Sequence, residues 1–442
     1  MARWPRVLCL LLLSSCLLGC ATYADRAVPV REAFFAGDLE RARSTIDKDL
    51  KRPRHDADVL KLERAVVELS SGRPKEAEQS LREVRDRFDY LEQKSVAEST
   101  LAMLTDDNRQ SYAGEDYEKI LIRSFLAISN LMQGGTDAQA YSLQITDKQQ
   151  QIIAAATDKN GNNPKHDYKQ VALGPYLHGL IREETHTNYD DAARASAMVV
   201  SWQPDFAYAR GDLERVRAGH HSAPGHGVLY VFTLVGHGPY KQETLEIPST
   251  VALLIADQIL SATNKYTLPP TIAPIKVPKV VQSTGGTSYV RVAVNGRPAG
   301  STATITDVGR MAVEQYQAVY PQVIARAIVR RVVKKGIVYG TKTAIGGGRN
   351  SFMDVALDVV GVAWEATEAA DTRSWSLLPD RIQVLRVELP VGSHQVALEA
   401  VGPYGAGAPE AAPVTITDGR NSYLLANFPD SHLVGKIVAS QP

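Results

Sequence analysis

The chain has 442 residues, a length that favours two or three domains over one, and its 49 basic side chains balance its 49 acidic ones. The apolar share of 44% and the charged share of 22% are typical of globular proteins, and they exclude wholesale disorder and a membrane protein with many spans. A net charge of zero argues against a nucleic-acid-binding protein, because such proteins carry a basic excess.

The N-terminus has the features of a secretory signal. Two arginines precede an apolar run, Val7 to Leu18, which is too short for a mature membrane helix of about twenty residues. The run ends in Leu-Leu-Gly-Cys at positions 17–20, which resembles the lipobox of bacterial lipoproteins. The resemblance implies that residues 1–19 are a signal peptide. It also implies that Cys20 carries a diacylglyceryl thioether and usually a further chain, such as palmitate, on its new amine.

The cysteine pattern agrees with a lipid anchor. Cys9, Cys16 and Cys20 all lie in the first twenty residues, which excludes a disulfide framework and a cysteine-based zinc site. Each buried methylene of an acyl chain contributes about 0.8 kcal/mol, so several chains anchor a protein stably. Ala21 follows Cys20, which resembles the default outer-membrane signal of Gram-negative lipoproteins. We therefore expect a lipid-anchored outer-membrane protein that faces the periplasm. An ordinary signal peptide with an accidental Cys20 is the alternative.

Residues 20–219 are expected to form an all-α domain of helical repeats. Gly-Asp-Leu-Glu-Arg-Ala at Gly37 is followed 35 residues later by Gly-Arg-Pro-Lys-Glu-Ala at Gly72, each after an apolar helical stretch. The pattern resembles the tetratricopeptide helix-turn-helix, whose period is about 34 residues; Gly permits the tight turn and Ala the close approach of helices. Further copies are expected at 117–135 and 176–192 with irregular spacing. A helical bundle without repeats is the alternative.

Residues 228–442 are expected to form an α+β domain with antiparallel strands, after a Gly- and His-rich linker at 220–227. The linker histidines have no acidic or cysteine partner nearby, so no metal site is expected there. Alternating apolar residues predict eight strands, the second, fourth and sixth returning beside the strand before them, and Asn295-Gly296 is a strong hairpin signal. The strands are Val228–Val235, Lys241–Ile247, Tyr289–Val294, Thr302–Thr306, Ile382–Leu389, His394–Ala400, Val414–Thr417 and Tyr423–Phe428.

A helical hairpin is expected at about 311–370. Its first helix, 321–335, carries a basic stripe, and its second, 351–370, carries acidic residues, so the two helices are expected to face each other across a Gly-rich surface loop. A hairpin inserted in the membrane is the alternative, but acidic residues in the apolar stretch count against it. The basic stripe is Arg326, Arg330 and Lys334, and the acidic residues are Asp354, Asp358, Glu365 and Glu368.

A dense polar and aromatic cluster follows the hairpin and contains Asp371, Arg373 and Trp375. Arg373 could pair with Asp371 or stack on Trp375, so the cluster is either a structural corner or a ligand site. The surrounding segment, 370–383, resembles the matching part of a family of uncharacterised proteobacterial lipoproteins. These pair a tetratricopeptide-like N-terminal half with an α+β C-terminal half. The resemblance covers most of the mature chain and implies the same two-part fold, but the family has no established activity.

The sequence shows no catalytic constellation: it has no Gly-x-Ser-x-Gly, no His-Glu-x-x-His and no cysteine after Cys20. We therefore expect no enzymatic activity, no cofactor and no metal. Helical repeats build concave surfaces that bind peptides or helices. We expect a protein-interaction adaptor or scaffold for other envelope proteins, in envelope assembly or cell-wall synthesis. A cell-wall or glycan-binding accessory protein is the first alternative, and a periplasmic enzyme the second.

Replacing Cys20 by Ser should abolish acylation, because a hydroxyl cannot form the thioether that carries the lipid. Cells grown with radiolabelled palmitate should label the wild-type chain and leave Cys20→Ser unlabelled. Cys16→Ser changes a cysteine inside the apolar run and is the matched control, which should be labelled like the wild type. Label on Cys20→Ser would show that the lipobox interpretation is wrong.

Overall fold

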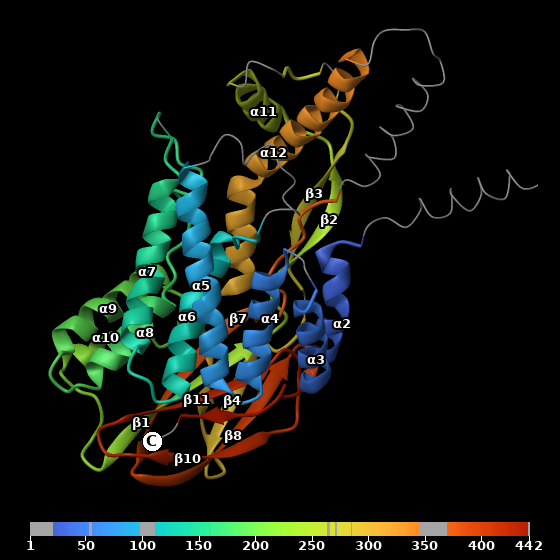
Figure 1. Ribbon diagram of the computed structural model, residues 1–442. Helices are drawn as coiled ribbons and strands as arrows, with labels where there is room; N and C mark the ends of the chain where they lie inside the picture. Colours follow the sequence, from blue (N-terminus) through green and yellow to red (C-terminus); the bar gives the residue numbers. More distant parts are fainter. Residues whose placement is uncertain are drawn as a thin grey trace, which may run out of the picture.

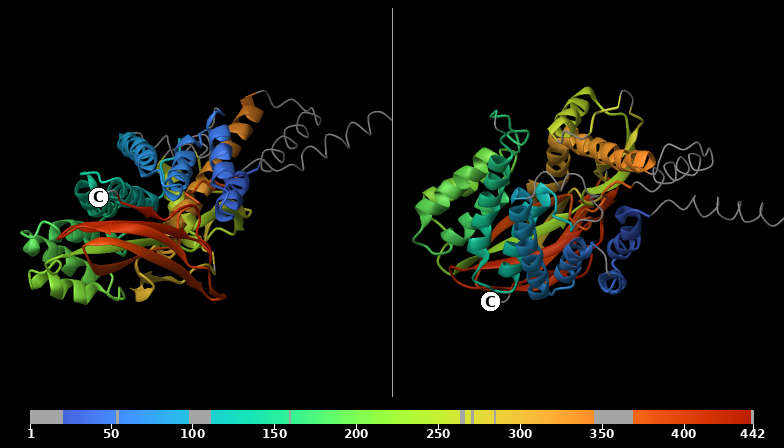
Figure 2. Two further views of the ribbon diagram at one scale, coloured as in Figure 1. Left: turned by 90° about the horizontal axis from the view of Figure 1, so that it is seen from below. Right: turned by 45° about the horizontal axis from the view of Figure 1, so that its top comes forward.

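The computed structural model describes residues 21–52, 55–97, 111–158, 160–262, 266–269, 272–283, 285–344 and 369–440. The described chain forms three layers, namely a layer of helices, a five-stranded sheet and a second sheet (Figures 1 and 2). An arm of helices and strands projects from one side of these layers (Figure 1). Cys20 lies outside the described residues. So does most of the expected second hairpin helix, 351–370, of which only residues 369 and 370 are described.

The described part of the N-terminal half is helical, as expected, and each helix contacts the next one along the chain. The helices are α2 (Tyr23–Phe35), α3 (Leu39–Leu50), α4 (Ala57–Ser70), α5 (Pro74–Ala97), α6 (Asp116–Met132), α7 (Ala138–Ala155), α8 (Leu173–Glu183), α9 (Tyr189–Trp202) and α10 (Ala209–Arg217).

Glycine shapes three of the turns between these helices. Gly37, Gly72 and Gly134 have φ of +80°, +77° and +71°, a left-handed conformation that other residues adopt only at a cost. After each glycine the next residue donates its backbone N–H to the carbonyl oxygen five residues earlier, which caps the preceding helix. Gly37 and Gly72 are the pair that repeats in the sequence, so the repeated motif marks the same turn twice.

The five-stranded sheet has the order β12-β11-β1-β7-β6. The antiparallel arrangement expected from the sequence is wrong at one place, because β1 runs parallel to β11. A parallel pair requires a long crossover, and here most of the C-terminal half lies between the two strands. The strands are β1 (His226–Val235), β6 (Ala303–Asp307), β7 (Arg381–Pro390), β11 (Asn421–Phe428) and β12 (Val438–Ala439).

The first strand joins two hydrophobic cores. Tyr230 and Phe232 of β1 lie in the core shared with the helices, whereas Leu229 and Val231 lie in the core shared with the second sheet. The helices and the sheet therefore have one continuous core, although the sequence suggests a boundary near 220–227.

The second sheet is antiparallel and has the order β10-β8-β4-β5, with β9 paired to β8. Asn295 and Gly296, with φ of +51° and +77°, form the expected turn between β4 and β5. The strands are β4 (Tyr289–Val294), β5 (Arg297–Ser301), β8 (Gly392–Gly402), β9 (Gly405–Ala406) and β10 (Glu410–Ile416).

Three expected strand pairings are wrong. β2 (Tyr240–Glu246) pairs with β3 (Ile275–Val281) instead of β1, β6 pairs with β7 instead of β4, and β8 pairs with β4 and β10 instead of β7. Alternating apolar residues identify a strand, but they do not identify the sheet to which the strand belongs, because a turn can lead the chain into another sheet. Gly238 permits one such exit, since a Cβ there would lie 2.1 Å from the carbonyl oxygen of Leu378.

The arm consists of β2, β3, α11 (Thr250–Ala262), which the sequence did not predict, and the outer part of α12 (Val308–Ala344). α12 corrects the expected helix 321–335. It begins at Val308 and continues to Ala344, through residues that the Gly content predicted as a loop. Ile324 and Ile328 are buried in a core with α11 and β3, so packing outweighs the low helix propensity of Pro and Gly. The rest of the predicted loop, 345–350, lies outside the described residues.

Gly37→Ala should lower the free energy of unfolding by about 1 kcal/mol, because the added Cβ meets no atom within 4 Å and only the left-handed φ is penalised. Gly211→Ala is the matched control. Gly211 lies inside α10 and its added Cβ also meets no atom within 4 Å, so alanine should raise the free energy of unfolding by about 0.5–1 kcal/mol. Urea unfolding measures both changes. Effects of the same sign would contradict the assigned turn.

Candidate functional site

Asp371 and Arg373, singled out from the sequence, form a buried ion pair. Arg373 donates from Nε and Nη2 to the two carboxylate oxygens of Asp371, at 2.9 and 2.7 Å, and from Nη1 to the carbonyl oxygen of His55 at 3.1 Å. Burial alone would raise the pKa of Asp371, but the hydrogen bond and charge of Arg373 hold it below its usual value. The predicted bridge is therefore present. The ring under the guanidinium is Tyr112, at 5.2 Å, and not Trp375.

Trp375 is a core residue. Its side chain is 0% exposed, and its ring centroid lies 5.3 Å from that of Phe125 in α6. Its backbone N–H donates to Glu118 Oε1 at 2.6 Å. Trp375 lies in the chain between the arm and β7, and it does not line the cleft described below.

Residues 374–377, here called the docked segment, lie on two buried glutamates of the helical layer. Glu63 of α4 accepts hydrogen bonds from the backbone N–H and hydroxyl of Ser376, at 2.8 and 2.7 Å, and from the N–H of Leu377 at 2.9 Å. Glu118 of α6 receives Trp375. Burial raises the pKa of Glu63 to about 7 although these hydrogen bonds lower it, and burial also raises the pKa of Glu118.

Neither glutamate was predicted from the sequence, although a signal for both exists. Glu63 and Glu118 each stand on the apolar face of an amphipathic helix, with large apolar residues three and four positions further along. A carboxylate at such a position is buried when the helix packs, so it needs donors from another segment. The donors to Glu63, and Trp375 among the donors to Glu118, lie more than 250 positions away, and helical periodicity cannot identify them. Tyr112, Glu115 and Tyr117 also donate to Glu118 from nearby positions.

A cleft of about 790 Å³ opens beside the Asp371–Arg373 pair. Its walls come from α5, α6, α7, the segments that flank them, β2, β3, α12 and the start of the segment that leads to β7. Apolar side chains, among them Ile152, Val319 and Val323, alternate with charged ones. The charged lining consists of Lys119, Lys148, Lys165, Lys241, Arg326, Arg330, Arg373, Glu92, Glu115, Asp116 and Asp371.

Most of these charges are paired at the cleft wall. Lys241 is buried and forms an ion pair with Glu115, while Lys119 pairs with Glu92 at 2.7 Å. Burial would raise the pKa of Glu92, but Lys119 and the neighbouring Lys148 hold it below its usual value. Across the cleft Arg326 is exposed, and its only bond within the described part of the chain goes to the carbonyl oxygen of Gln322 in its own helix.

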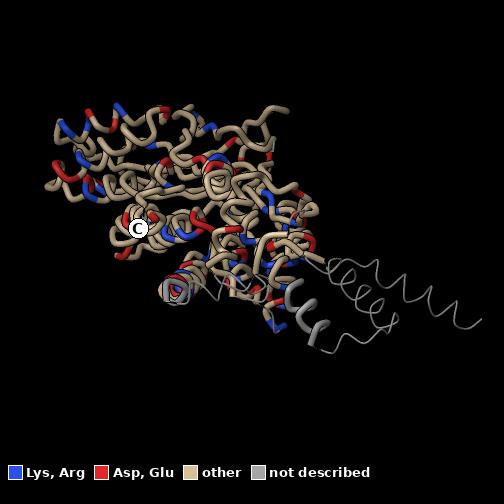
Figure 3. The backbone as a smooth tube through the Cα atoms, turned by 90° about the horizontal axis from the view of Figure 1, so that it is seen from above, with Lys and Arg blue, Asp and Glu red and all other residues tan. Residues whose placement is uncertain are grey.

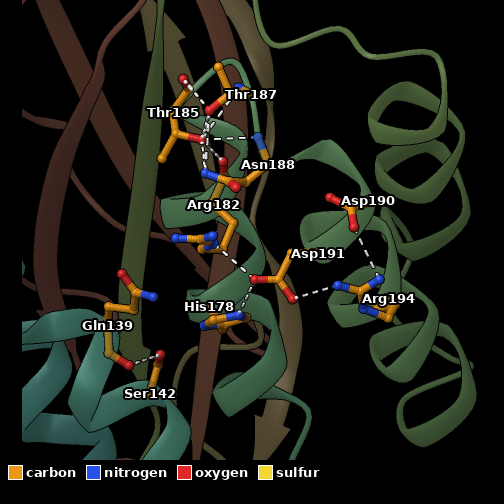
Figure 4. Close-up of polar contacts among 10 residues, drawn as sticks. All are labelled: Gln139, Ser142, His178, Arg182, Thr185, Thr187, Asn188, Asp190, Asp191 and Arg194. Atoms are coloured by element: carbon orange, nitrogen blue, oxygen red, sulfur yellow. Dashed lines mark hydrogen bonds and ion pairs between the residues drawn. The ribbon is translucent and has the colours of Figure 1, made fainter.

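A second polar cluster joins α8 and α9 (Figure 4). Asp191 hydrogen-bonds to His178 Nε2 at 3.2 Å and accepts from Arg194 at 3.4 Å, and it forms an ion pair with Arg182, whose Nε lies 2.9 Å away. Burial would raise the pKa of Asp191, but His178 and the two arginines hold it below its usual value. The contacts fix one helix against the next, and this cluster is a structural link between them.

The described residues set further limits on the chemistry. No three of their His, Cys, Asp and Glu side chains are grouped so that they could hold a metal ion. Within the same residues, no helix combines the length and the apolar character that a membrane crossing requires. Figure 3 shows basic and acidic residues close together on the helices, in agreement with the paired charges of the cleft. No family model matches the chain, and no curated protein or solved structure is detectably similar to it.

Glu63→Gln should reduce the pH dependence of stability. With a folded-state pKa of about 7 against an ordinary value of 4.5, protonated Glu63 contributes stability that is complete below about pH 4.5 and lost as the pH rises through 7. The shift corresponds to about 3 kcal/mol, which Glu63→Gln should remove from the pH profile between 4.5 and 8. Urea unfolding at several pH values measures it.

Glu40→Gln is the control for this experiment. The Glu40 side chain is exposed, so its replacement should leave the pH profile unchanged. If the free energy of unfolding of wild type and of Glu63→Gln changed with pH in the same way, Glu63 would have the same pKa in the folded and unfolded chains. That result would contradict the effect of burial described above.

Proposed function

We propose that the chain is an outer-membrane lipoprotein that acts as an adaptor or scaffold for other envelope proteins, in envelope assembly or cell-wall synthesis. The cleft is the observation that carries this proposal. It combines charged and apolar side chains from segments far apart in the sequence, as a binding surface for a protein segment does.

The contacts at the start of α2 support the proposal of a lipid anchor at Cys20. Thr22 caps α2, and its backbone N–H and hydroxyl donate to the Asp25 carboxylate at 2.8 and 2.7 Å. Ala24 donates its N–H to the Thr372 hydroxyl at 3.0 Å, which ties the start of α2 to the segment before β7. Cys20 precedes this cap by two residues, which span at most about 7 Å. Acyl chains on Cys20 would therefore hold the folded body close to the bilayer.

We also propose that the helical layer is a degenerate tetratricopeptide-like array, which the shared glycine turn at Gly37, Gly72 and Gly134 supports. Such arrays usually bind partners on one face. Here the docked segment and the five-stranded sheet already cover a face of the helices. On that face Glu63 and Glu118 accept their hydrogen bonds from donors of the chain itself. A partner is therefore expected in the cleft.

The lining of the cleft favours an acidic partner segment with apolar side chains. Seven basic and four acidic side chains line the cleft. Arg326 has no acidic partner among the described residues and is available to an incoming carboxylate. Val319 and Val323 lie on the same helix and offer apolar contact.

A photo-reactive amino acid placed in the cleft tests the adaptor proposal. Gln151 of α7 and Gln322 of α12 line it from two sides, so each position should crosslink the same envelope protein in cells. Arg326→Glu should weaken both adducts severalfold, because it repels an acidic partner. Tyr404, which is 96% exposed between β8 and β9, is the control position and should give no such adduct.

The same experiment separates the alternatives. Adducts between the cleft positions and peptidoglycan would support the glycan-binding accessory protein instead. If neither cleft position yields a discrete adduct, or if Tyr404 yields the same one, the cleft is not the site of an adaptor.

A further inference from the structure

Exposed apolar side chains gather in one stretch of the arm. Among the described residues, ten large hydrophobic side chains are exposed, and four of them lie within ten consecutive positions. These four, here called the arm patch, are Leu245 (66% exposed) at the end of β2, Ile247 (78%), and Val251 (55%) and Leu254 (62%) on α11. A group of exposed apolar side chains of this kind is typical of a surface that contacts a membrane or another protein.

Helix α11 has apolar residues on both sides, although Asp257, Gln258 and Ser261 are also exposed on it. Ala252, Ala256 and Leu260 are buried against α12 and β3, which accounts for one face. Val251 and Leu254 lie on the remaining surface, and Asp257 is the only charged residue among the thirteen of the helix. A helix packed only against its own arm normally has a polar outer face, so α11 has the composition of a helix with a second apolar contact.

The neighbouring helix α12 supplies positive charge. From Gln315 to Ala344 it contains no acidic residue; Arg326 is exposed on it, and Arg331 is half-buried. Arg331 donates to the carbonyl oxygens of Ala273 and Pro274, at 3.1 and 2.9 Å, which fixes this cation at the start of β3. On the strands, Glu243 is paired with Lys276 at 2.9 Å. Cations beside an apolar helix fit a bilayer that contains anionic lipid.

The arm and the start of the chain lie on the same side of the molecule. Figures 1 and 2 show α2 beginning on the side from which the arm projects. α2 also contacts the base of the arm, where the Arg31 guanidinium lies 3.8 Å from the ring centroid of Tyr240 in β2. A tether at Cys20 therefore brings the arm toward the membrane that holds it.

We propose that the arm patch inserts into the headgroup region of the membrane, beside the basic helix α12. The tether in this argument rests on the proposed lipoprotein function, whereas the arm patch itself is a property of the folded chain. The arm lies at the interface and does not cross the bilayer. It orients the body and presents the cleft at a fixed height above the surface.

Vesicle binding of a soluble chain tests this inference independently of lipidation. Residues 20–442 with Cys20→Ser are mixed with vesicles of phosphatidylethanolamine and phosphatidylglycerol, and the bound fraction is measured by sedimentation. Leu254→Glu and Ile247→Glu should each lower the partition coefficient by about tenfold, the cost of losing one buried apolar side chain. Removing phosphatidylglycerol should also weaken binding. Val391→Glu, at a residue 50% exposed between β7 and β8, is the matched control and should bind like the parent chain.

Each other outcome overturns the inference. A parent chain that does not bind vesicles, or Leu254→Glu and Ile247→Glu chains that bind as well as the parent, would show that the arm patch does not contact lipid. A parent dimer that the same substitutions convert to monomer, without any effect on vesicle binding, would assign the arm patch to a second copy of the chain. The palmitate-labelling experiment at Cys20 tests only the lipid anchor. Its result does not affect the vesicle experiment, because the chain used there carries Cys20→Ser.

Discussion

The structure depends on the contact between two buried carboxylates and the docked segment. Glu63 and Glu118 belong to the helical layer. Ser376 and Leu377, at the entrance to β7, donate to Glu63, and Trp375 donates to Glu118, which also accepts from Tyr112, Glu115 and Tyr117 nearby. A buried carboxylate without donors costs several kcal/mol, so the helices and the strands are each incomplete without the other. The single core that runs from α2 to the five-stranded sheet follows from this contact.

The residues directly before the docked segment also hold the start of α2 and form part of the cleft wall, which are the parts of the molecule that the proposed function uses. Thr372 receives the N–H of Ala24 at the start of α2, and Asp371 and Arg373 form part of the cleft wall. The proposed anchor, the docked segment and the cleft are therefore joined through a few consecutive residues. Membrane attachment and partner binding would then act on one rigid corner of the molecule, with the arm beside it.

The sequence predicted local structure well where a local cause exists. Gly37 and Gly72 mark helix turns because their φ is positive, and Asn295-Gly296 marks a hairpin for the same reason. It failed where distant segments decide the outcome. The pairing of β8 with β4, and the extension of α12 before Pro321 and beyond residue 335, depend on tertiary packing. In the candidate site Asp371 and Arg373 were identified, but Glu63 and Glu118 were not, since the docked segment that donates to both lies far away in the sequence.

Hydrogen exchange at the amides of Trp375, Ser376 and Leu377 tests the central claim most directly. All three donate to buried carboxylates of the helical layer, so the account predicts that they exchange only through global unfolding, at the rate of the slowest amides of β1. Exchange of these three amides through local opening, while β1 stays protected, would contradict the account. It would mean that the docked segment rests on the helices without holding the two parts together.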